Sequence, residues 1–317
     1  MILVTGGAGF IGSNFLYKLY EQDPAHQVVC VDSLTYAANV NYIRPLINRG
    51  FVRLETVDIT RKDQLQFVFD TVRPDYVVHF AAETHVDRSI HNLNPFVKTN
   101  IQGTINLLEL SLTVPRFKKF VHVSTDEVYG SLDFDAPSSA ETSAIETNSP
   151  YSASKAASDN FVRAFYKTHG LPAVITNCSN NYGPNQHREK FIPTVITNAL
   201  ADQSIPVYGT GSNVRDWLYV EDHCNALNLV LEQGTPGERY NISGGQEVAN
   251  IDLARKLLRL LGKPEDLLSF VTDRPGHDLR YSIDCSKIAK LGYCPQYTLE
   301  QGLEKTIEWY KTNDSHS

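Results

Sequence analysis

The chain has 317 residues, a formal net charge of -7 and 42% hydrophobic residues. This length and composition fit a globular protein with one large domain or two closely joined ones. The net negative charge disfavours nucleic-acid binding, which usually needs a basic surface. No stretch approaches the length of a membrane-spanning helix, and the start MILVTGGAGF lacks the pattern of a signal peptide. We therefore expect a cytoplasmic protein without nucleic-acid or membrane partners.

Short apolar runs alternate with amphipathic stretches in the first half of the chain. The runs predict strands at residues 2–5, 27–32, 52–57, 76–80, 119–124 and 173–178. The amphipathic stretches predict helices at residues 14–21, 62–72 and 100–112. Such alternation is typical of an α/β protein with a parallel sheet that is covered on both faces. Right-handed crossovers then give a doubly wound sheet.

The second half of the chain has a less regular pattern. Helices are predicted at residues 192–201, 220–232, 251–261 and 299–310. Residues 180–185, 208–213 and 273–278 are rich in Gly, Pro, Asn and Asp, and we expect loops there. We expect a smaller C-terminal lobe of loops and helices over the carboxyl edge of the sheet, with a frayed tail at residues 312–317. The predicted domains are 1–178, to which 217–243 returns, and a lobe of 179–216 and 244–317.

Three glycines directly follow the first predicted strand. Gly6, Gly9 and Gly12 lie in TGGAGFIGS, where Gly6 permits a tight turn, Gly9 admits a pyrophosphate and Gly12 lets a helix pack closely. Asp32 ends the second strand, where its carboxylate can bind an adenosine ribose. It would repel a 2′-phosphate, so the pattern predicts a Rossmann domain that binds NAD rather than NADP. The alternative is a glycine turn without a ligand.

Other residues at strand ends are candidates for the same cofactor site. Asp58 follows the third strand and can meet the adenine amino group, cap the next helix, or do both. Small residues after the fourth strand leave room for the cofactor beside the backbone. The further candidates are Phe10, Ile11, Ser33, Leu34, Thr35, Ile59, Phe80, Ala81, Ala82 and Thr99.

Tyr151 and Lys155 are four residues apart in YSASK, on one face of a predicted helix that runs to about residue 169. An ammonium beside a phenol favours the phenolate, so we expect a lowered Tyr151 pKa and a role as general base. Lys155 can also hold the nicotinamide ribose. Thr125, at the end of the fifth strand, can bind the substrate hydroxyl that Tyr151 deprotonates. The alternative is a Tyr/Lys pair on a helix surface.

These motifs resemble those of the extended short-chain dehydrogenase/reductases. TGGAGFIG, Asp32, YSASK and STDEVYG are similar, within that family, to the dTDP-glucose 4,6-dehydratases, over residues 2–309. The resemblance implies oxidation at C4, loss of water across C5–C6 and return of the hydride to C6. It implies that Glu127 is the base at C5 and Asp126 the acid at C6. The alternative for this acidic pair is a solvent-exposed turn.

The resemblance also implies further contacts. Asn181 would lie near the nicotinamide. The implied nucleotide-sugar contacts, besides Thr125, are Thr84, His85, Asn180, Lys190, Phe191, Pro206, Val207, Tyr208, Arg215, Asn241, Asn250, Arg274 and His277. Arginines suit a diphosphate because their forked donors bind it in pairs. The alternative for Arg215 is a salt bridge with the adjacent Asp216.

The chain departs from the family pattern in three places. Residues 131–148 are shorter than in several members, Asn177 stands where many have Arg, and residues 185–188 lack the usual aromatic. These positions bear on the shape of the pocket and on the nucleotide. The alternatives are a dehydratase of a UDP- or CDP-sugar, a 4-epimerase, and an NAD-binding regulator without activity. The acidic pair disfavours the epimerase, and the complete catalytic set disfavours the regulator.

Two further expectations concern metals and assembly. The five cysteines show no C-x-x-C spacing and the histidines form no H-x-x-x-H cluster, so no metal site is expected. The resemblance implies a homodimer in which the helix at residues 100–112 and the helix that begins near Tyr151 pair across a two-fold axis.

Overall fold

A parallel sheet forms the centre of the protein, and the computed structural model describes residues 1–313. The seven strands lie in the order β10-β6-β5-β4-β1-β2-β3. They are β1 (Ile2–Thr5), β2 (Val28–Asp32), β3 (Val52–Thr56), β4 (Tyr76–His79), β5 (Lys119–Thr125), β6 (Ala173–Cys178) and β10 (Arg239–Ile242). Six of them lie within one residue of the predicted bounds. The predicted α/β fold with a doubly wound sheet is therefore confirmed.

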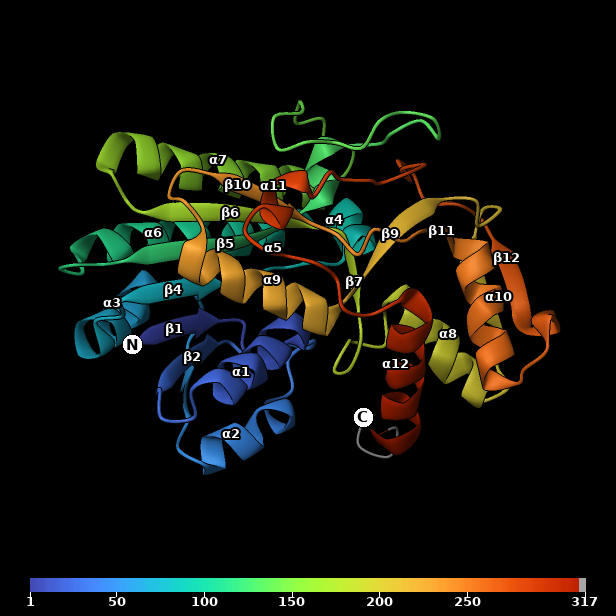
Figure 1. The fold of residues 1–317 in the computed structure, drawn as a ribbon, viewed down its shortest axis with the longest axis horizontal. Helices are drawn as coiled ribbons and strands as arrows, with labels where there is room; N and C mark the ends of the chain where they lie inside the picture. Colours follow the sequence, from blue (N-terminus) through green and yellow to red (C-terminus); the bar gives the residue numbers. More distant parts are fainter. Residues whose placement is uncertain (314–317) are drawn as a thin grey trace.

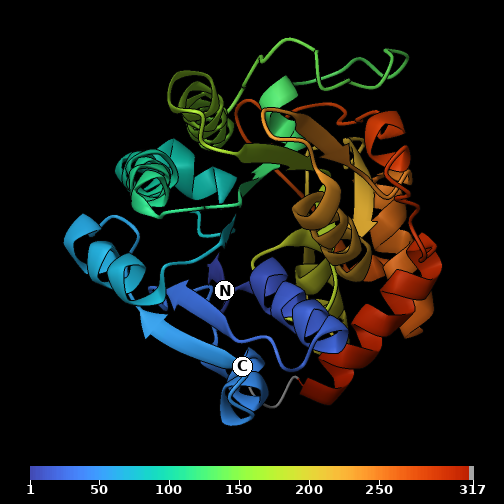
Figure 2. The ribbon, with the colours of Figure 1, turned by 60° about the vertical axis from the view of Figure 1, so that its left-hand side comes forward.

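Helices cover both faces of this sheet (Figures 1 and 2). One face carries α3 (Lys62–Val72), α6 (Thr104–Thr113) and α7 (Pro150–His169). The other carries α1 (Phe10–Gln22), which packs against α9 (Val220–Gln233). The alternation of side chains along a strand separates the two cores: Leu3 packs with Leu107, whereas Val4 packs with Phe15.

The helix predicted at residues 100–112 begins earlier than expected and is not an α-helix throughout. Its first part is a π-helix, η2 (Val97–Gly103), which continues without a break into α6. Within η2, the Asn100 side chain accepts a bond from the backbone N–H of Glu83 at 2.8 Å and donates to its carbonyl at 3.0 Å. A π-helical turn often marks a functional site. Here it anchors the loop after β4 to the helix layer. Two short helices, α4 (Val86–His91) and α5 (Asn94–Phe96), precede it.

The smaller lobe contains strands that the sequence pattern did not predict. One sheet has the order β11-β9-β7, and β8 pairs with β12 in another. Their bounds are β7 (Asn180–Tyr182), β8 (Ile205–Tyr208), β9 (Val214–Tyr219), β11 (Glu247–Ala249) and β12 (Leu268–Val271). The prediction of a loop was therefore wrong for residues 180–182 but right for residues 183–185, and the prediction of a lobe made of loops and helices was wrong. The strands are short and partly polar, so their periodicity is weak.

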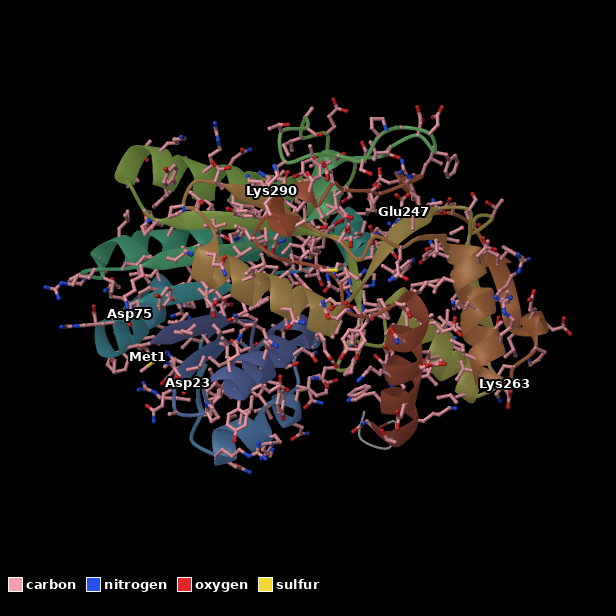
Figure 3. All side chains as sticks on the ribbon, in the orientation of Figure 1. Met1, Asp23, Asp75, Glu247, Lys263 and Lys290 are labelled. Carbon is pink, nitrogen blue, oxygen red and sulfur yellow. The ribbon has the colours of Figure 1, made fainter. Side chains whose placement is uncertain are left out.

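The helices of the smaller lobe follow the prediction closely. They are α8 (Phe191–Leu200), α10 (Asn250–Leu261) and α12 (Leu299–Asn313), and they pack around Tyr182, Trp217 and Leu303. The rest of the tail that was expected to fray, after Asn313, lies outside the described residues. Figure 3 places Asp75 at the end of the molecule formed by the large sheet and Lys263 at the opposite end.

Five short elements complete the fold: η1 (Val40–Tyr42), α2 (Arg44–Asn48), η3 (Asp126–Tyr129), η4 (Glu265–Leu267) and α11 (Ser286–Ala289). The segment 131–148 lies beside residues 280–283, where single β-bridges join Leu132 to Arg280 and Ser139 to Ile283. In the part of the chain from 1 to 313, no helix is long and apolar enough to cross a membrane.

Candidate active site

A cavity of about 610 Å³ opens at the carboxyl ends of the central strands. This is the edge where doubly wound sheets bind their ligands. All of the predicted cofactor-binding residues except Leu34 line it, as do all five predicted catalytic residues. Of the other predicted substrate contacts, Thr84, Asn180 and Lys190 line it as well. The volume lies within the range of small-molecule and cofactor sites.

The glycine turn after β1 forms one wall of the cavity. Gly6 has a φ of +70°, and a Cβ there would lie 2.7 Å from the backbone nitrogen of Ala81. A Cβ on Gly12 would overlap the carbonyl oxygen of Gly6. A Cβ on Gly9 would have only that same oxygen nearby, at 3.3 Å, so this side of the turn is open. The helix α1 begins directly after Gly9 without a side-chain cap, so its free N–H groups suit an anion such as a pyrophosphate.

Asp32 fixes the end of β2 against this turn. Its carboxylate accepts bonds from the backbone N–H of Ala8 at 2.9 Å and of Leu34 at 2.8 Å. Burial raises the Asp32 pKa, and these two bonds oppose the rise. Leu34 has a φ of +52° and an exposed side chain, so it meets this site through its backbone only. The turn and the carboxylate together fit the diphosphate and ribose of a dinucleotide.

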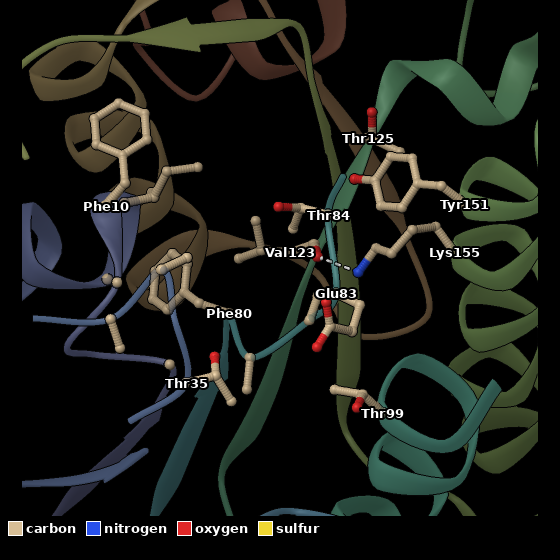
Figure 4. A pocket seen from close by; sticks show the side chains of 18 of the residues that line it. Phe10, Thr35, Phe80, Glu83, Thr84, Thr99, Val123, Thr125, Tyr151 and Lys155 are labelled. Carbon is tan, nitrogen blue, oxygen red and sulfur yellow. Dashed lines mark hydrogen bonds between the residues drawn. The ribbon is translucent and has the colours of Figure 1, made fainter. Parts of the chain in front are cut away.

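Tyr151 and Lys155 project from the first two turns of α7 into the cavity (Figure 4). Ser149 caps this helix, because its hydroxyl accepts the N–H of Ser152 at 3.0 Å and the Ser152 hydroxyl accepts the N–H of Ser149 in return. The Lys155 Nζ donates to the Val123 carbonyl at 2.9 Å. The helix start and the end of β5 therefore fix both side chains.

The expected lowering of the Tyr151 pKa is absent from this structure. Burial, followed by the charges of Glu127, Cys178 and Asp126, holds the Tyr151 pKa well above its ordinary value. Burial also lowers the Lys155 pKa. The prediction considered the lysine alone and left out the burial of the phenol and the carboxyl groups beside it.

The acidic pair forms η3, which begins directly after Thr125. The Thr125 hydroxyl accepts the N–H of Glu127 and donates to Asp126 Oδ1, both at 3.2 Å. Asp126 is only 3% exposed, and its Oδ2 has no hydrogen-bond partner among the described residues. The alternative of a solvent-exposed turn is therefore wrong for this pair.

The two carboxyl groups have different electrostatic surroundings. Burial raises the Asp126 pKa well above its usual value, and the charges of Glu127 and Asp216 add to the rise. Burial also raises the Glu127 pKa, but the charges of Arg274, Arg215 and Lys190 oppose that rise. Asp126 is therefore the group suited to hold a proton, and Glu127 is the one suited to accept it.

The cations beside Glu127 come from three different segments. Arg215 on β9 donates to the backbone carbonyls of Val214 at 2.8 Å and Asp278 at 3.0 Å. Asp216 accepts the N–H of Gly244 instead of pairing with Arg215, so the salt-bridge alternative is wrong. The two adjacent side chains project to opposite sides of the strand.

Arg274 and Lys190 complete this group of cations. Arg274 NH1 lies 3.4 Å from Asp87 Oδ1, and its buried Nε has no partner among the described residues. The Tyr208 hydroxyl donates to the other oxygen of Asp87 at 3.2 Å. Lys190 Nζ donates to the Thr84 carbonyl at 3.0 Å. These contacts bring α4 against the smaller lobe at the mouth of the cavity.

Three predicted substrate contacts have side chains that pack inside the protein in this structure. The Asn241 amide donates to the Ser139 carbonyl at 3.0 Å and accepts the Tyr129 hydroxyl at 2.8 Å, so it has no face open to a ligand. Val207 is fully buried, and Phe191 stacks on Trp217 in the core of the lobe. The remaining predicted contacts that do not line the cavity are His85, Pro206, Tyr208, Arg215, Asn250, Arg274 and His277.

Sequence reasoning missed several residues that line the cavity. Cys178 ends β6 beside Lys155, and burial raises its pKa to about 12. Its position at a strand end was a usable signal. Glu189 contacts Arg88 at 3.3 Å and the Tyr36 hydroxyl at 3.1 Å across the cavity mouth. Its loop carries no motif that could have indicated this. Among residues 1–313, no cluster of His, Cys, Asp and Glu is suited to a metal ion.

Comparison with known proteins agrees with this geometry. A family model described as GDP-mannose 4,6 dehydratase matches residues 3–306. The chain belongs to this family. It is 48% identical to a dTDP-glucose 4,6-dehydratase from Haemophilus influenzae, over 100% of this chain and 99% of the relative. It is 47% identical to one from Escherichia coli, over 98% and 94%.

Solved structures with the same fold have different activities. A dTDP-glucose 4,6-dehydratase from Streptomyces venezuelae with NAD and TYD bound has a TM-score of 0.95 and 47% identity, covering 99% of this chain and 98% of its own. A UDP-glucose 4-epimerase from Thermus thermophilus in complex with NAD has a TM-score of 0.90 and 27% identity, covering 98% of each chain. The shared fold therefore does not determine the reaction, which depends on side chains in the site.

Proposed function

We propose that this chain is an NAD-dependent hydro-lyase that converts dTDP-glucose to dTDP-4-keto-6-deoxyglucose. One observation carries the proposal: a buried carboxyl group at Asp126, whose Oδ2 has no hydrogen-bond partner among residues 1–313, lies next to Glu127 in the same cavity as Tyr151 and Lys155. Oxidation alone needs only the tyrosine, whereas removal of water needs an acid and a base as well. The identity of 48% to a dTDP-glucose 4,6-dehydratase supports the same substrate.

We propose that NAD and the nucleotide sugar bind to two different domains. Residues 1–178, with 217–243, would hold NAD: the turn at Gly9 faces the pyrophosphate, Asp32 the adenosine ribose and Lys155 the nicotinamide ribose. The pairing of β10 with β6 and the packing of α9 on α1 support the return of 217–243 to this domain. Residues 179–216 and 244–317 would hold the nucleotide sugar. When bound, NAD⁺ supplies the hydride acceptor of the reaction and later the hydride donor.

In the first step, Tyr151 takes the proton of the C4 hydroxyl while Thr125 holds its oxygen. The raised Tyr151 pKa opposes this step in the free protein. The Lys155 ammonium and the positive charge of NAD⁺ would both favour the phenolate once the cofactor is in place. With the C4 hydride passed to the bound cofactor in the same step, the product would be a ketone at C4, which makes the proton at C5 acidic.

In the second step, Glu127 takes the C5 proton and Asp126 protonates the C6 hydroxyl, which leaves as water. The raised Asp126 pKa favours the protonated form of this acid, which suits it to donate a proton. The hydride removed from C4 then enters at C6, and Glu127 returns its proton to C5. The sum is the loss of one water molecule, with no net oxidation and no external reductant.

Competing substrates test the nucleotide assignment. We would incubate the purified protein with dTDP-, UDP- or CDP-glucose and follow the 4-keto product by its absorbance in alkali. We expect the highest kcat/KM with dTDP-glucose, whose diphosphate would meet Arg215, Arg274 and Lys190. Turnover of only the UDP- or CDP-sugar would contradict the nucleotide assignment. A C4 epimer without any 4-keto product would contradict dehydration.

We also propose that the protein is a homodimer that pairs through α6 and α7. Large apolar side chains are exposed on this side of the molecule, among them Val97, Leu112 and Phe161. A two-fold axis there would bury them in a bundle of four helices. The cytoplasmic location inferred from the sequence stays a prediction.

A further inference from the structure

A buried polar network lies beneath α7, away from the cavity, and Arg239 is at its centre. Arg239 is on β10, the edge strand that lies beside β6 under α7 (Figure 1). Its NH1 donates to Asp159 Oδ2 at 3.0 Å and to Asn177 Oδ1 at 2.9 Å. Asp159 is 1% exposed and Asn177 is fully buried. This guanidinium is costly to lose, because Asn177 Oδ1 would then lose its donor and Asp159 Oδ2 would keep only the Asn177 Nδ2 at 3.4 Å.

Each of these two acceptors leads to a catalytic residue. The Asn177 Nδ2 donates to the backbone carbonyl of Thr125 at 2.8 Å, directly before the acidic pair. Asp159 follows Lys155 by four residues on α7, so the two lie on one face of the helix. Through Asn177 and Asp159, Arg239 therefore connects the edge of the sheet to the end of β5 and to the start of α7.

His122 on β5 completes the surroundings of Asp159. Its Nε2 lies 3.3 Å from Asp159 Oδ1 and 3.1 Å from the Ser158 hydroxyl. Burial lowers the His122 pKa to about 4, so this ring is neutral at physiological pH. The cation that is hydrogen-bonded to Asp159 in this network is therefore Arg239.

Asp159 in turn acts on Lys155. Burial raises the Asp159 pKa, but the His122 bond and the Arg239 charge outweigh burial and hold the pKa below its usual value. The ionised Asp159 favours the Lys155 ammonium against burial. The titratable groups that face Lys155 from its own helix and from the strands beneath are Tyr151, Asp159, His79, His122 and Cys178.

We propose that Arg239 is a positioning residue of the active site, which acts through Asp159 on Lys155 and through Asn177 on Thr125. The inference rests on the proposed function, because it assigns Lys155 and Thr125 to the oxidation at C4. It adds a residue that touches neither substrate nor cofactor. Loss of the Arg239 charge would favour the neutral form of Asp159. The Lys155 ammonium would then be less favoured, and formation of the Tyr151 phenolate would be less favourable.

Four proteins test this inference with the 4-keto assay. We expect Arg239→Met to lower kcat at pH 7 by about tenfold or more and to move the acid limb of the kcat–pH profile to higher pH. The KM for dTDP-glucose should stay within about twofold, because Arg239 does not line the cavity. Arg239→Lys keeps the charge and should recover most of kcat and the wild-type profile. The matched control is Glu238→Gln, which removes the surface partner of Lys287 one residue earlier on the chain.

A purely structural role predicts a different result. In that case Arg239→Met would lower the melting temperature while the kcat–pH profile of the folded fraction stayed that of the wild type, and this would overturn the inference. Should Arg239→Met not fold, Arg239→Gln keeps donors for both acceptors without the charge, and it must show the same shift. A wild-type protein that forms no 4-keto sugar would count against the proposed function. An active wild type with an unchanged profile in the Arg239 variants would count against this inference alone.

Discussion

Two adjacent carboxyl groups differ in chemistry because their surroundings differ. Asp126 is buried, and its Oδ2 has no partner within the described part of the chain, whereas Glu127 lies near Arg274, Arg215 and Lys190. The sequence identified the pair through the motif STDEVYG. The resemblance already implied that Asp126 is the acid and Glu127 the base. The motif could not show the electrostatic reason, because the cations beside Glu127 come from segments far away in the chain.

Replacement of the proposed base separates oxidation from elimination. Glu127→Gln removes the group that takes the C5 proton and leaves Tyr151 and Lys155 in place. We expect loss of 4-keto-6-deoxy product by at least about a hundredfold, as is usual for a lost general base. A slow first hydride transfer should persist and be visible as the absorbance of the reduced cofactor. Product formation at the wild-type rate would refute the role of Glu127.

Replacement of the proposed acid should stabilise the fold. Because the Asp126 pKa is raised in the folded state, that state holds a proton which the unfolded chain releases, and stability falls as pH rises above the ordinary value. Asp126→Asn removes this loss, so we expect a higher free energy of unfolding than in the wild type at pH 7. Below about pH 4, where both states hold the proton, the gain should vanish. Urea unfolding at pH 4 and pH 7 measures both values, and equal stabilities of the two proteins at pH 7 would contradict the assignment.

At the scale of elements, the helices and strands with the strongest hydrophobic pattern in the sequence were predicted best. The buried strands of the central sheet are continuous apolar runs, and their bounds could be read to within one residue. The strand β7 consists of Asn180, Asn181 and Tyr182, and only its pairing with β9 makes it a strand. The π-helix η2 was equally hidden, because it depends on a contact between Asn100 and the distant loop after β4.

The start of α1 gives a test of cofactor binding at this scale. Gly12→Ala places a Cβ against the Gly6 carbonyl, so α1 must move away from the turn. We expect NAD affinity to fall by about tenfold or more, measured by calorimetry on protein stripped of nucleotide. Gly50→Asn serves as a control, because a Cβ at Gly50 meets no atom within 4 Å and Asn tolerates a positive φ. An unchanged NAD affinity in Gly12→Ala would contradict the proposed role of the turn.

The face of α6 and α7 gives a test of the proposed dimer. Phe161→Lys places a charge on the apolar surface of α7, and we expect it to shift the protein towards monomers in sedimentation experiments. Phe67→Lys on α3 is the matched control, since Phe67 is also exposed but lies on another helix. A dimer that withstands Phe161→Lys, or that dissociates equally in Phe67→Lys, would place the interface elsewhere.

At the scale of the whole molecule, the site combines local motifs with distant contacts. The glycine turn, Asp32, Tyr151 and Lys155 were recognisable because each motif lies within one strand–helix unit. The carboxylate of Glu189 meets Tyr36 and Arg88 only after the chain has folded. Asn177 departs from the family pattern, and its partner Arg239 could not have been inferred from either position alone.

The central claim is that one hydride leaves C4 and returns to C6 of the same sugar, with Asp126 and Glu127 removing water in between. The most direct measurement uses dTDP-glucose with deuterium at C4. Mass spectrometry and NMR of the product locate the label. The account predicts one deuterium in the C6 methyl group of a 4-keto product. A product with the label still at C4, or a 4-keto product without deuterium at C6, would contradict it.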